Sequence, residues 1–486
     1  MKESEREARG AFDVFQTQKY LLGRKRSVRY ARCMNNQTQL NERPKGVPTV
    51  SRVFPDGSLV ELVHDPKEQK TRLAHWQTGT VAITESLALP DGTTLIPVPA
   101  RNNLIKHQAI LLPEKPEPSG ETSALLADIE SYIHRYVDLS PAFLHIASAY
   151  VLLSWVYDAF NELPYLRFRG DYGSGKTRAL LIVGSLCYKP FFASGASTIS
   201  PIFYTLDTFG STLVVDETDF RFSDEKAELV KIFNNGNVRG FPVLRSMATP
   251  QHTFDPRAFS VFGPKIVAMR NSFDDPALES RFLTEDMGKR TLRSDIPINL
   301  PDVQQEEART LRNRLLSYRF ANFAQTCIDP TAYDERLSPR LNQIMSPLLS
   351  VVGEAPLRDA IRENMAGAEE ALQSHRGTSP EGQVLETVLG LTLAWERDYL
   401  SIAEITESFI ARFGAEYDRP ITPRYIGHLI RNRLRLYTYK RHGSYVLPLA
   451  QDEHLAVLAA RYGLTLPTGG HGDVGTSARG MHERPP

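Results

Sequence analysis

Residues 122–295 alternate short apolar runs with stretches of helical periodicity. The runs "PYLRFRG", "PFFAS", "STLVVDE" and "KIVAMR" have the length and the β-branched or aromatic content of buried strands. Between the last two runs, "SDEKAELVKIFNNG" repeats its apolar residues at helical spacing. Alternating strands and helices are typical of an α/β domain with a parallel sheet. The pattern therefore predicts an α/β core over 122–295, followed by a mostly helical region over 296–375.

The segments before this core have a different pattern. Residues 47–112 contain short β-like runs, and two Pro-Asp-Gly turns between apolar runs predict hairpins. These features predict a small β-rich domain, joined to the core by a proline-rich linker, "PEKPEPSGE", over 113–121. Residues 1–46 are polar, with arginines and lysines gathered in "GRKRSVRYARC". Such a segment is either a nucleic-acid-binding arm or a solvated, partly disordered tail.

The segments after the core end in a second small module. A loop-like boundary, "QSHRGTSPEG", precedes residues 381–450, where three helices and a hairpin follow one another in the order of a winged helix. Thr422 and Pro423 begin the third helix as its cap and first-turn proline. Residues 467–486 have almost no large apolar side chains and are expected to be disordered. The apolar residues of the third helix that can face a core are Ile426, Leu429, Ile430 and Leu434.

Composition describes the setting of the protein more than its chemistry. Lysine plus arginine equals aspartate plus glutamate, at 57 each, so only a local asymmetry of charge can indicate a nucleic-acid partner. The cysteines are far apart and lack metal-ligand spacing, which argues against disulfides and structural zinc and favours a cytoplasmic setting. The longest apolar run, "FLHIASAYVLLSWVY", is too short for a bilayer and contains polar residues. It predicts a buried helix and no membrane partner.

The stretch "GDYGSGKT" matches the phosphate-loop pattern G-x-x-x-x-G-K-[ST] between a predicted strand and a predicted helix. Glycines let the backbone N–H groups turn toward phosphates, and the helix N-terminus adds partial positive charge. Lys176 would reach the β- and γ-phosphates of ATP, and the Thr177 hydroxyl would ligate Mg²⁺. The alternative is a glycine-rich turn that binds no nucleotide. The predicted nucleotide-binding residues of this loop are Gly170, Gly173, Ser174, Gly175, Lys176 and Thr177.

Two acids, Asp216 and Glu217, directly follow the apolar strand "STLVV". Ligands of α/β sheets bind at the carboxyl ends of the strands, so both acids are expected near the phosphate loop. Asp216 would hold Mg²⁺ through water, and Glu217 would polarise the attacking water for ATP hydrolysis. Because strands that end in two acids are common, it is the preceding phosphate loop that favours these roles.

A third segment, "FGPKIVAMRNSFDDPALESRF", makes the chain resemble the AAA+ ATPases. The resemblance implies a three-layer P-loop core with a helical lid over 296–375. It implies that Asn271, or alternatively Arg270, senses the γ-phosphate at the end of its strand. It also implies that Arg281 is an arginine finger that reaches a neighbouring subunit, where its planar charged fork stabilises phosphoryl charge. An intrachain salt bridge is the alternative role of Arg281.

Two further segments extend the resemblance. In "LSPRLNQIMSPLLSVV", Arg340 matches a second arginine sensor that would bind the nucleotide; the alternative is an ordinary surface arginine. In helicases of the superfamily-three and minichromosome-maintenance types, an insertion at "KIFNNGNVRGFPVLR" lines a pore and touches DNA. By that resemblance Arg239 and Arg245 contact DNA phosphates or lie in a subunit interface. The resemblance further implies a homo-oligomer, in the form of a hexameric ring.

The C-terminal module concentrates positive charge. Between Ile421 and Ala450 there are six arginines and lysines and no acids, a local charge of +6. This asymmetry suits phosphate contacts, with the third helix in the major groove of DNA and the wing on the backbone. Helical spacing places Arg424, Arg431 and Arg435 on one exposed face. Binding of another protein is the alternative. The predicted DNA-binding residues of the module are Arg424, Arg431, Arg435, Lys440 and Arg441.

These features together predict an ATP-hydrolysing motor that acts on DNA. The resemblance suggests a helicase or a replication initiator of a mobile element. An ATP-gated DNA-binding regulator or loader without unwinding activity is the alternative. A small-molecule kinase with the same phosphate loop is disfavoured, because a kinase needs neither Glu217, nor an arginine finger, nor a winged helix.

Overall fold

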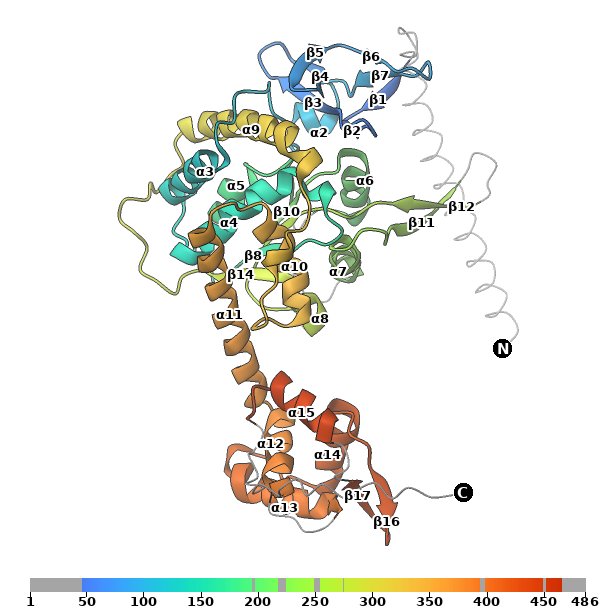
Figure 1. The fold of residues 1–486 in the computed structure, drawn as a ribbon, viewed down its shortest axis with the longest axis vertical. Coiled ribbons are helices and arrows are strands. Elements are labelled where there is room, and N and C mark those ends of the chain that lie inside the picture. The colour runs from blue at the N-terminus through green and yellow to red at the C-terminus, as the bar shows by residue number, and fades with distance from the viewer. Residues whose placement is uncertain are drawn as a thin grey trace, which may run out of the picture. The chain divides into compact units, whose positions relative to one another are not determined.

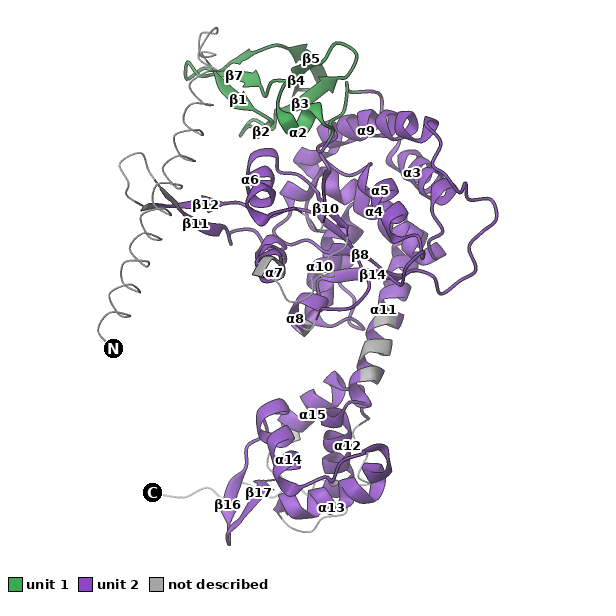
Figure 2. Cartoon of the chain, turned by 180° about the vertical axis from the view of Figure 1, so that it is seen from behind, with its two compact units in different colours: residues 1–108, 112–116 green, residues 109–111, 117–486 purple. Residues whose placement is uncertain are grey.

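The structure of the protein is a computed structural model that describes residues 46–194, 197–216, 224–248, 254–273, 275–393, 398–448 and 452–465. The chain divides into two compact units (Figure 2). The first comprises the described part of residues 1–108 together with 112–116, and the second comprises 109–111 and the described part of 117–486. Apart from Gly46, both predicted tails lie outside the described residues.

The first unit is built from two small sheets, with strand orders β2-β3-β4-β5 and β1-β7-β6. Both predicted hairpins are confirmed, since β2 pairs antiparallel with β3 and β6 with β7 across the two Pro-Asp-Gly turns. The Asp56 carboxylate accepts a hydrogen bond from the Ser58 backbone N–H at 3.0 Å, which closes the first turn. The elements are β1 (Val47–Thr49), β2 (Ser51–Val53), β3 (Leu59–Asp65), β4 (Lys70–Gln77), β5 (Thr80–Thr84), β6 (Leu87–Ala88), β7 (Thr94–Pro97) and α2 (Asn103–Lys106).

The second unit contains a five-stranded sheet among its described residues, in the order β14-β8-β13-β10-β9 (Figure 1). Every neighbouring pair is parallel, so the carboxyl ends of the strands lie along one edge. The predicted strands in the α/β core are confirmed as four of these five, and β14 was not predicted. The strands are β8 (Tyr165–Arg169), β9 (Phe191–Ser194), β10 (Leu213–Asp216), β13 (Lys265–Met269) and β14 (Phe282–Asp286).

Helices pack on this sheet and on one another. Helix α5 contacts β8, β10 and β13, and α3 and α4 contact α5 in turn. A hairpin, β11–β12, follows α7, and α6 contacts both α7 and β12 (Figure 1). The elements are α3 (Thr122–Tyr136), α4 (Pro141–Trp155), η1 (Tyr157–Ala159), α5 (Lys176–Gly184), α6 (Ile199–Phe209), α7 (Asp224–Gly236), β11 (Val243–Ala248), β12 (Phe254–Phe259), α8 (Pro276–Glu279), α9 (Val303–Asn322), η2 (Phe323–Gln325), η3 (Pro330–Ala332), α10 (Pro339–Ser350) and α11 (Ala355–Gly377).

Helix α4 contains the longest apolar run and is a core helix, as predicted. Ser140 caps it, with its hydroxyl accepting from the Phe143 N–H at 3.2 Å, and Pro141 occupies the first turn. From Ile146 to Trp155 every residue of the helix is buried. In the part of the chain that the structure describes, no helix is both long and apolar enough to cross a membrane.

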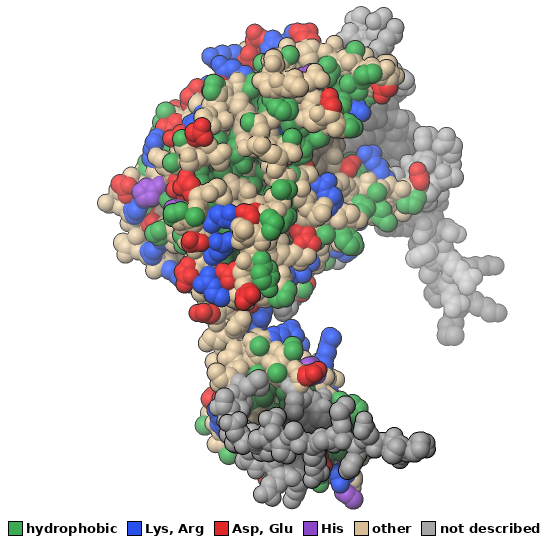
Figure 3. Space-filling view, viewed as in Figure 1, with side chains coloured by type: hydrophobic (Ala, Val, Ile, Leu, Met, Phe, Trp, Pro, Cys, Tyr) green, Lys and Arg blue, Asp and Glu red, His purple; other side chains and the backbone are tan. Residues whose placement is uncertain are grey.

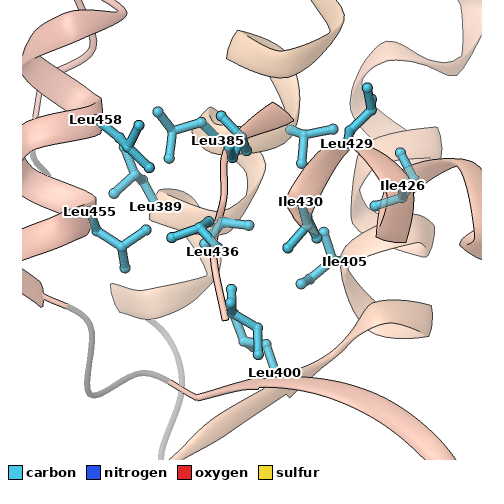
Figure 4. Packing of buried hydrophobic residues seen from close by; sticks show 14 of the residues in the cluster. Leu385, Leu389, Leu400, Ile405, Ile426, Leu429, Ile430, Leu436, Leu455 and Leu458 are labelled. Atoms are coloured by element: carbon cyan, nitrogen blue, oxygen red, sulfur yellow. The ribbon is translucent and has the colours of Figure 1, made fainter. Parts of the chain in front are cut away.

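The C-terminal part of the second unit has a separate apolar core, shown in Figure 4. Ile426, Leu429, Ile430 and Leu434 are all buried in it, as their spacing predicted. A three-stranded antiparallel sheet, β15-β17-β16, lies beside the helices. The elements are α12 (Pro380–Leu393), β15 (Tyr399–Ser401), α13 (Ile402–Phe413), η4 (Gly414–Glu416), α14 (Pro423–His428), η5 (Leu429–Arg433), β16 (Tyr439–Arg441), β17 (Ser444–Pro448) and α15 (Asp452–Arg461).

The loop-like boundary predicted at "QSHRGTSPEG" is wrong. Helix α11 continues through Gly377 and α12 begins at Pro380, so two residues separate the helices. The Ser379 hydroxyl accepts from the Gly382 N–H at 3.2 Å and caps α12. The polar residues, glycine and proline of this stretch therefore end one helix and begin the next.

The prediction that Arg424, Arg431 and Arg435 share one face of a regular helix is also wrong. Helix α14 stops at His428, and η5 is a π-helical turn in which the Leu434 N–H bonds the Leu429 carbonyl at 2.9 Å. Arg435 lies beyond the helix, at a φ of 55°. Because a π-turn has more residues than an α-turn, the face that contains Arg424 does not continue regularly to Arg435.

Candidate functional site

The phosphate-loop sequence forms the bend between β8 and α5. Gly175 has a φ of 88° and precedes the first turn of α5, a conformation that costs a glycine least. A Cβ on Gly170 would lie 2.6 Å from the Met287 carbonyl oxygen. The local backbone thus requires glycine at positions 170 and 175. The bend that these glycines allow leaves Lys176 and Thr177 in the first turn of α5.

Residues from the loop, from helix α5 and from strand β10 meet at this bend. The Thr177 hydroxyl donates to the Asp216 carboxylate at 2.8 Å, and the Lys176 ammonium donates to the Asp171 carbonyl at 2.6 Å. Asp216 is the last residue of β10, and the parallel sheet places that strand end beside the loop. A hydroxyl and a carboxylate are hard oxygen ligands, so this pair fits Mg²⁺ chemically.

A cavity of about 560 Å³ opens over the loop. Its lining combines the loop, Asp216 and the end of β13 with apolar residues that include Val137, Leu292 and Ile298. Ile298 is 90% exposed and Leu292 is 66% exposed, so apolar surface is available at the cavity. This size and mixture of surfaces are typical of small-molecule sites.

The sequence did not predict the apolar residues of the cavity lining, such as Val137, Leu292 and Ile298. The Arg178 guanidinium donates to the carbonyls of Pro297 and Ile298, which holds that segment beside the loop. Asp138 and Arg290, which also line the cavity, form an ion pair at 3.7 Å. These residues are far apart in the chain and match no motif, so no sequence signal could have found them.

The two candidate phosphate sensors, Arg270 and Asn271, lie differently with respect to the cavity. Met269 pairs with Arg169 in the parallel register, and the Gly170 N–H bonds the Met269 carbonyl at 3.3 Å, so residue 270 emerges beside the loop. The Arg270 guanidinium carbon lies 3.4 Å from the centroid of the Tyr172 ring and lines the cavity. Asn271 is exposed and is not among the described residues that line it.

Arg281 and Arg340 come together away from this cavity. The Arg281 guanidinium donates to the Asn234 side-chain carbonyl of α7, and the Arg340 guanidinium donates to the Ala277 carbonyl at 3.4 Å. Burial, and next the positive charge of Arg340, lower the pKa of Arg281. Neither arginine is among the described residues that line the cavity, so Arg340 does not face its own chain's phosphate loop. Among the described residues, the recorded ion pairs do not include Arg281.

The predicted hydrolytic acid, Glu217, lies outside the described residues, but the structure does describe the two predicted pore arginines, Arg239 and Arg245. Arg239 donates to the Asp158 and Phe160 carbonyls at 2.6 and 3.1 Å, and Arg245 forms an ion pair with Glu228. Both guanidinia therefore have partners within the chain.

The cations of the C-terminal module are mostly exposed. Arg424, Arg435, Lys440 and Arg441 are exposed and Arg431 is half-buried, and the ion pairs recorded among the described residues include none of these five. Arg433, in contrast, pairs with Glu381 at 3.5 Å. On the face of the larger unit that Figure 3 presents, lysines and arginines are interspersed with acids. Within the C-terminal module, the stretch without acids is residues 421–450, which contains all five of these cations.

Comparisons with known proteins give weak structural likenesses. No protein-family model matches the chain, and no curated protein matches it. The active helicase Cch of SCCmec type IV is 12% identical, with a TM-score of 0.39 over 89% of this chain and 84% of that chain. The apo C-terminal region of NrS-1 is 11% identical, with a TM-score of 0.33 over 80% of this chain and 96% of that chain.

A third likeness is to the Aeropyrum pernix Orc1 protein in complex with DNA. It is 15% identical, with a TM-score of 0.20 over 70% of this chain and 98% of that chain. Likenesses at this level do not establish a function, so the residues of the site carry the assignment.

Proposed function

We propose that the protein is an ATP-hydrolysing motor of the AAA+ type that acts on DNA as a homo-oligomer. The observation that carries the proposal is the meeting of Lys176, Thr177 and Asp216 at one glycine-rich bend, beside a cavity of about 560 Å³. Measurement of MgATP binding and of phosphate release, with and without DNA, tests it. Hydrolysis without any added acceptor would exclude the kinase alternative.

The site residues have separate roles in this proposal. Lys176 and the loop N–H groups bind the phosphates, and Thr177 and Asp216 hold Mg²⁺. Mg²⁺, when bound, supplies positive charge against the phosphate oxygens. Glu217, next to Asp216 in the sequence, remains the proposed base for the attacking water. The apolar side chains of the cavity lining, among them Val137 and Leu292, provide a surface for the nucleoside.

We expect Arg270→Ala to lower kcat about 10²- to 10³-fold, because the variant loses a charged donor that lines the cavity and would contact the transferring phosphate. Asn271→Ala is the matched control, since Asn271 is the next residue but lies outside the cavity lining, and its kcat should stay within about twofold. Steady-state ATPase assays of the two variants measure this. The opposite order of effects would return the sensor role to Asn271.

DNA binding is assigned to the C-terminal module as a winged helix. We expect Arg424→Gln with Arg435→Gln to weaken duplex binding and to reduce the slope of log K against log salt by about 1 for each residue. Arg433→Gln is the control, because Arg433 is on the same segment but pairs with Glu381. Fluorescence anisotropy over a salt series measures both. An unchanged slope would favour the protein-binding alternative.

The finer assignments are helicase or replication initiator of a mobile element, against a loader without unwinding activity. A strand-displacement assay on a forked duplex separates these. Negative-stain images with a non-hydrolysable ATP analogue test the hexameric ring. In this proposal residues 296–375 form the lid of the ATPase core, and residues 381–450 form the DNA-binding domain.

A further inference from the structure

The C-terminal sheet carries exposed tyrosines beside its cations. Tyr437, just before β16, is 64% exposed, and Tyr445 on β17 is 44% exposed. The Tyr437 and Tyr439 rings are nearly parallel, at 19°, with centroids 6.3 Å apart. Tyrosine rings this accessible leave apolar surface in water, which suggests a partner that covers it. We call Tyr437, Tyr439 and Tyr445 the wing tyrosines.

Cations from two elements surround one of these rings. The Arg431 guanidinium carbon lies 4.8 Å from the Tyr445 ring centroid, and the Lys440 ammonium lies 5.4 Å from it. Arg431 comes from the π-helical turn, whereas Lys440 comes from β16, where it pairs directly with Tyr445. Alternation along β16 places Tyr439 and Arg441 together on the other face of the hairpin. The Arg441 guanidinium carbon lies 4.4 Å from the centroid of the Tyr399 ring. Both faces thus combine an aromatic ring with a cation.

The backbone is strained at two positions of the C-terminal module, one before β16 and one after it. Arg435 and His442 have φ values of 55° and 49°, in the left-handed region that favours glycine. His442 and Gly443 form the two-residue turn between β16 and β17, which explains the second value. Arg435 takes a position after a helix where glycine would be cheaper. The backbone strain at Arg435 therefore lies between the π-helical turn and the hairpin.

We propose that the wing tyrosines stack on unpaired bases of single-stranded DNA while the neighbouring cations contact its phosphates. This inference rests on the proposed action on DNA and adds the form of DNA that the module binds. Duplex phosphates need cations alone, and stacked base pairs offer no free ring faces, whereas a single strand supplies both anions and ring faces. A protein partner would be expected to bring acids, but it has no general need for parallel rings.

The test uses the full-length protein and two probes, an oligo-dT single strand and a blunt duplex. We expect Tyr437→Ala with Tyr445→Ala to weaken binding to oligo-dT about tenfold or more and to leave duplex binding and both salt slopes unchanged. The same positions changed to Phe should keep wild-type affinity, because the rings remain. Tyr333→Ala is a position control, since Tyr333 is 62% exposed but lies outside the C-terminal module. Thermal melting checks that each variant folds.

The possible results separate this inference from the proposed function. Equal losses on the duplex, or no loss on oligo-dT, would overturn stacking and leave the ATPase and DNA roles standing. A wild-type protein that binds neither probe would overturn DNA binding and stacking together. Cross-linking of iodouracil-substituted single strands to Tyr437 or Tyr445 would support stacking directly.

Discussion

Lys176→Ala is expected to abolish detectable MgATP binding and to lower ATP turnover by at least about 10²- to 10³-fold. Lys176 lies in the first turn of α5, and its ammonium donates to the Asp171 carbonyl within the same loop, 2.6 Å away. A bound triphosphate would replace that carbonyl with phosphate oxygens, for which a positive charge has far higher affinity. Alanine leaves the helix intact, since it is the best helix former, so the loss reports phosphate binding.

The matched control is Lys289→Ala. Lys289 follows Gly288 of the cavity lining, but it is exposed and its ammonium pairs with Asp286 at 2.7 Å. Its loss should leave ATP binding within about twofold, because exposed ion pairs contribute little. Isothermal titration with MgATP and a phosphate-release assay measure both variants. Turnover that survives in Lys176→Ala would show that this bend is not the nucleotide site.

Arg281→Ala is expected to retain MgATP binding but to lower hydrolysis about 10³-fold or more, as for loss of an arginine finger. The reason is its place in the fold. Arg281 is within electrostatic range of Arg340 and does not line the cavity of its own chain, so in the proposed homo-oligomer the phosphate that it would stabilise is that of another subunit. A guanidinium is planar and permanently charged, which suits it to stabilise the phosphoryl charge of a neighbouring subunit in the proposed oligomer. Arg340→Ala should show the same pattern to a smaller degree.

Mixing variants distinguishes the two roles of Arg281. Arg281→Ala supplies an intact phosphate loop and Lys176→Ala supplies an intact arginine, so mixed oligomers should recover part of the activity. Arg336→Ala is the control, because this exposed arginine has its own carboxylate partners, Asp334 and Glu363. In Arg281→Ala, loss of the hydrogen bond to Asn234 should lower the free energy of unfolding by about 1 kcal/mol, which a melting curve checks. No recovery in the mixture would favour an intrachain role.

Short-range patterns predicted much of the fold correctly. The Pro-Asp-Gly turns gave the hairpins at β2–β3 and β6–β7, and the spacing of Ile426, Leu429, Ile430 and Leu434 gave the buried face of α14 and η5. Each of these depends on conformational preferences or hydrophobic periodicity within a few residues. The roles of the site residues, in contrast, stay predictions until the assays above are done.

Three features could not be predicted because they depend on contacts between distant segments. Arg270, rather than Asn271, faces the cavity because β13 pairs with β8 in one register. Arg340 approaches Ala277 because of the way α10 packs, and Arg245 is paired because Glu228 lies on the neighbouring helix. The surroundings of each side chain were set by the pairing of strands and the packing of helices.

The sequence by itself determined the phosphate-loop pattern, four of the five strands of the core sheet, and the basic segment of the C-terminal module. Those properties are written in adjacent residues, whose backbone preferences and charges act locally. Only the tertiary structure decided which side chains share the cavity and which arginines lie apart from it. It also placed cations beside the wing tyrosines. Such neighbours come from segments far apart in the chain, and they meet only when the sheet and the helices have packed.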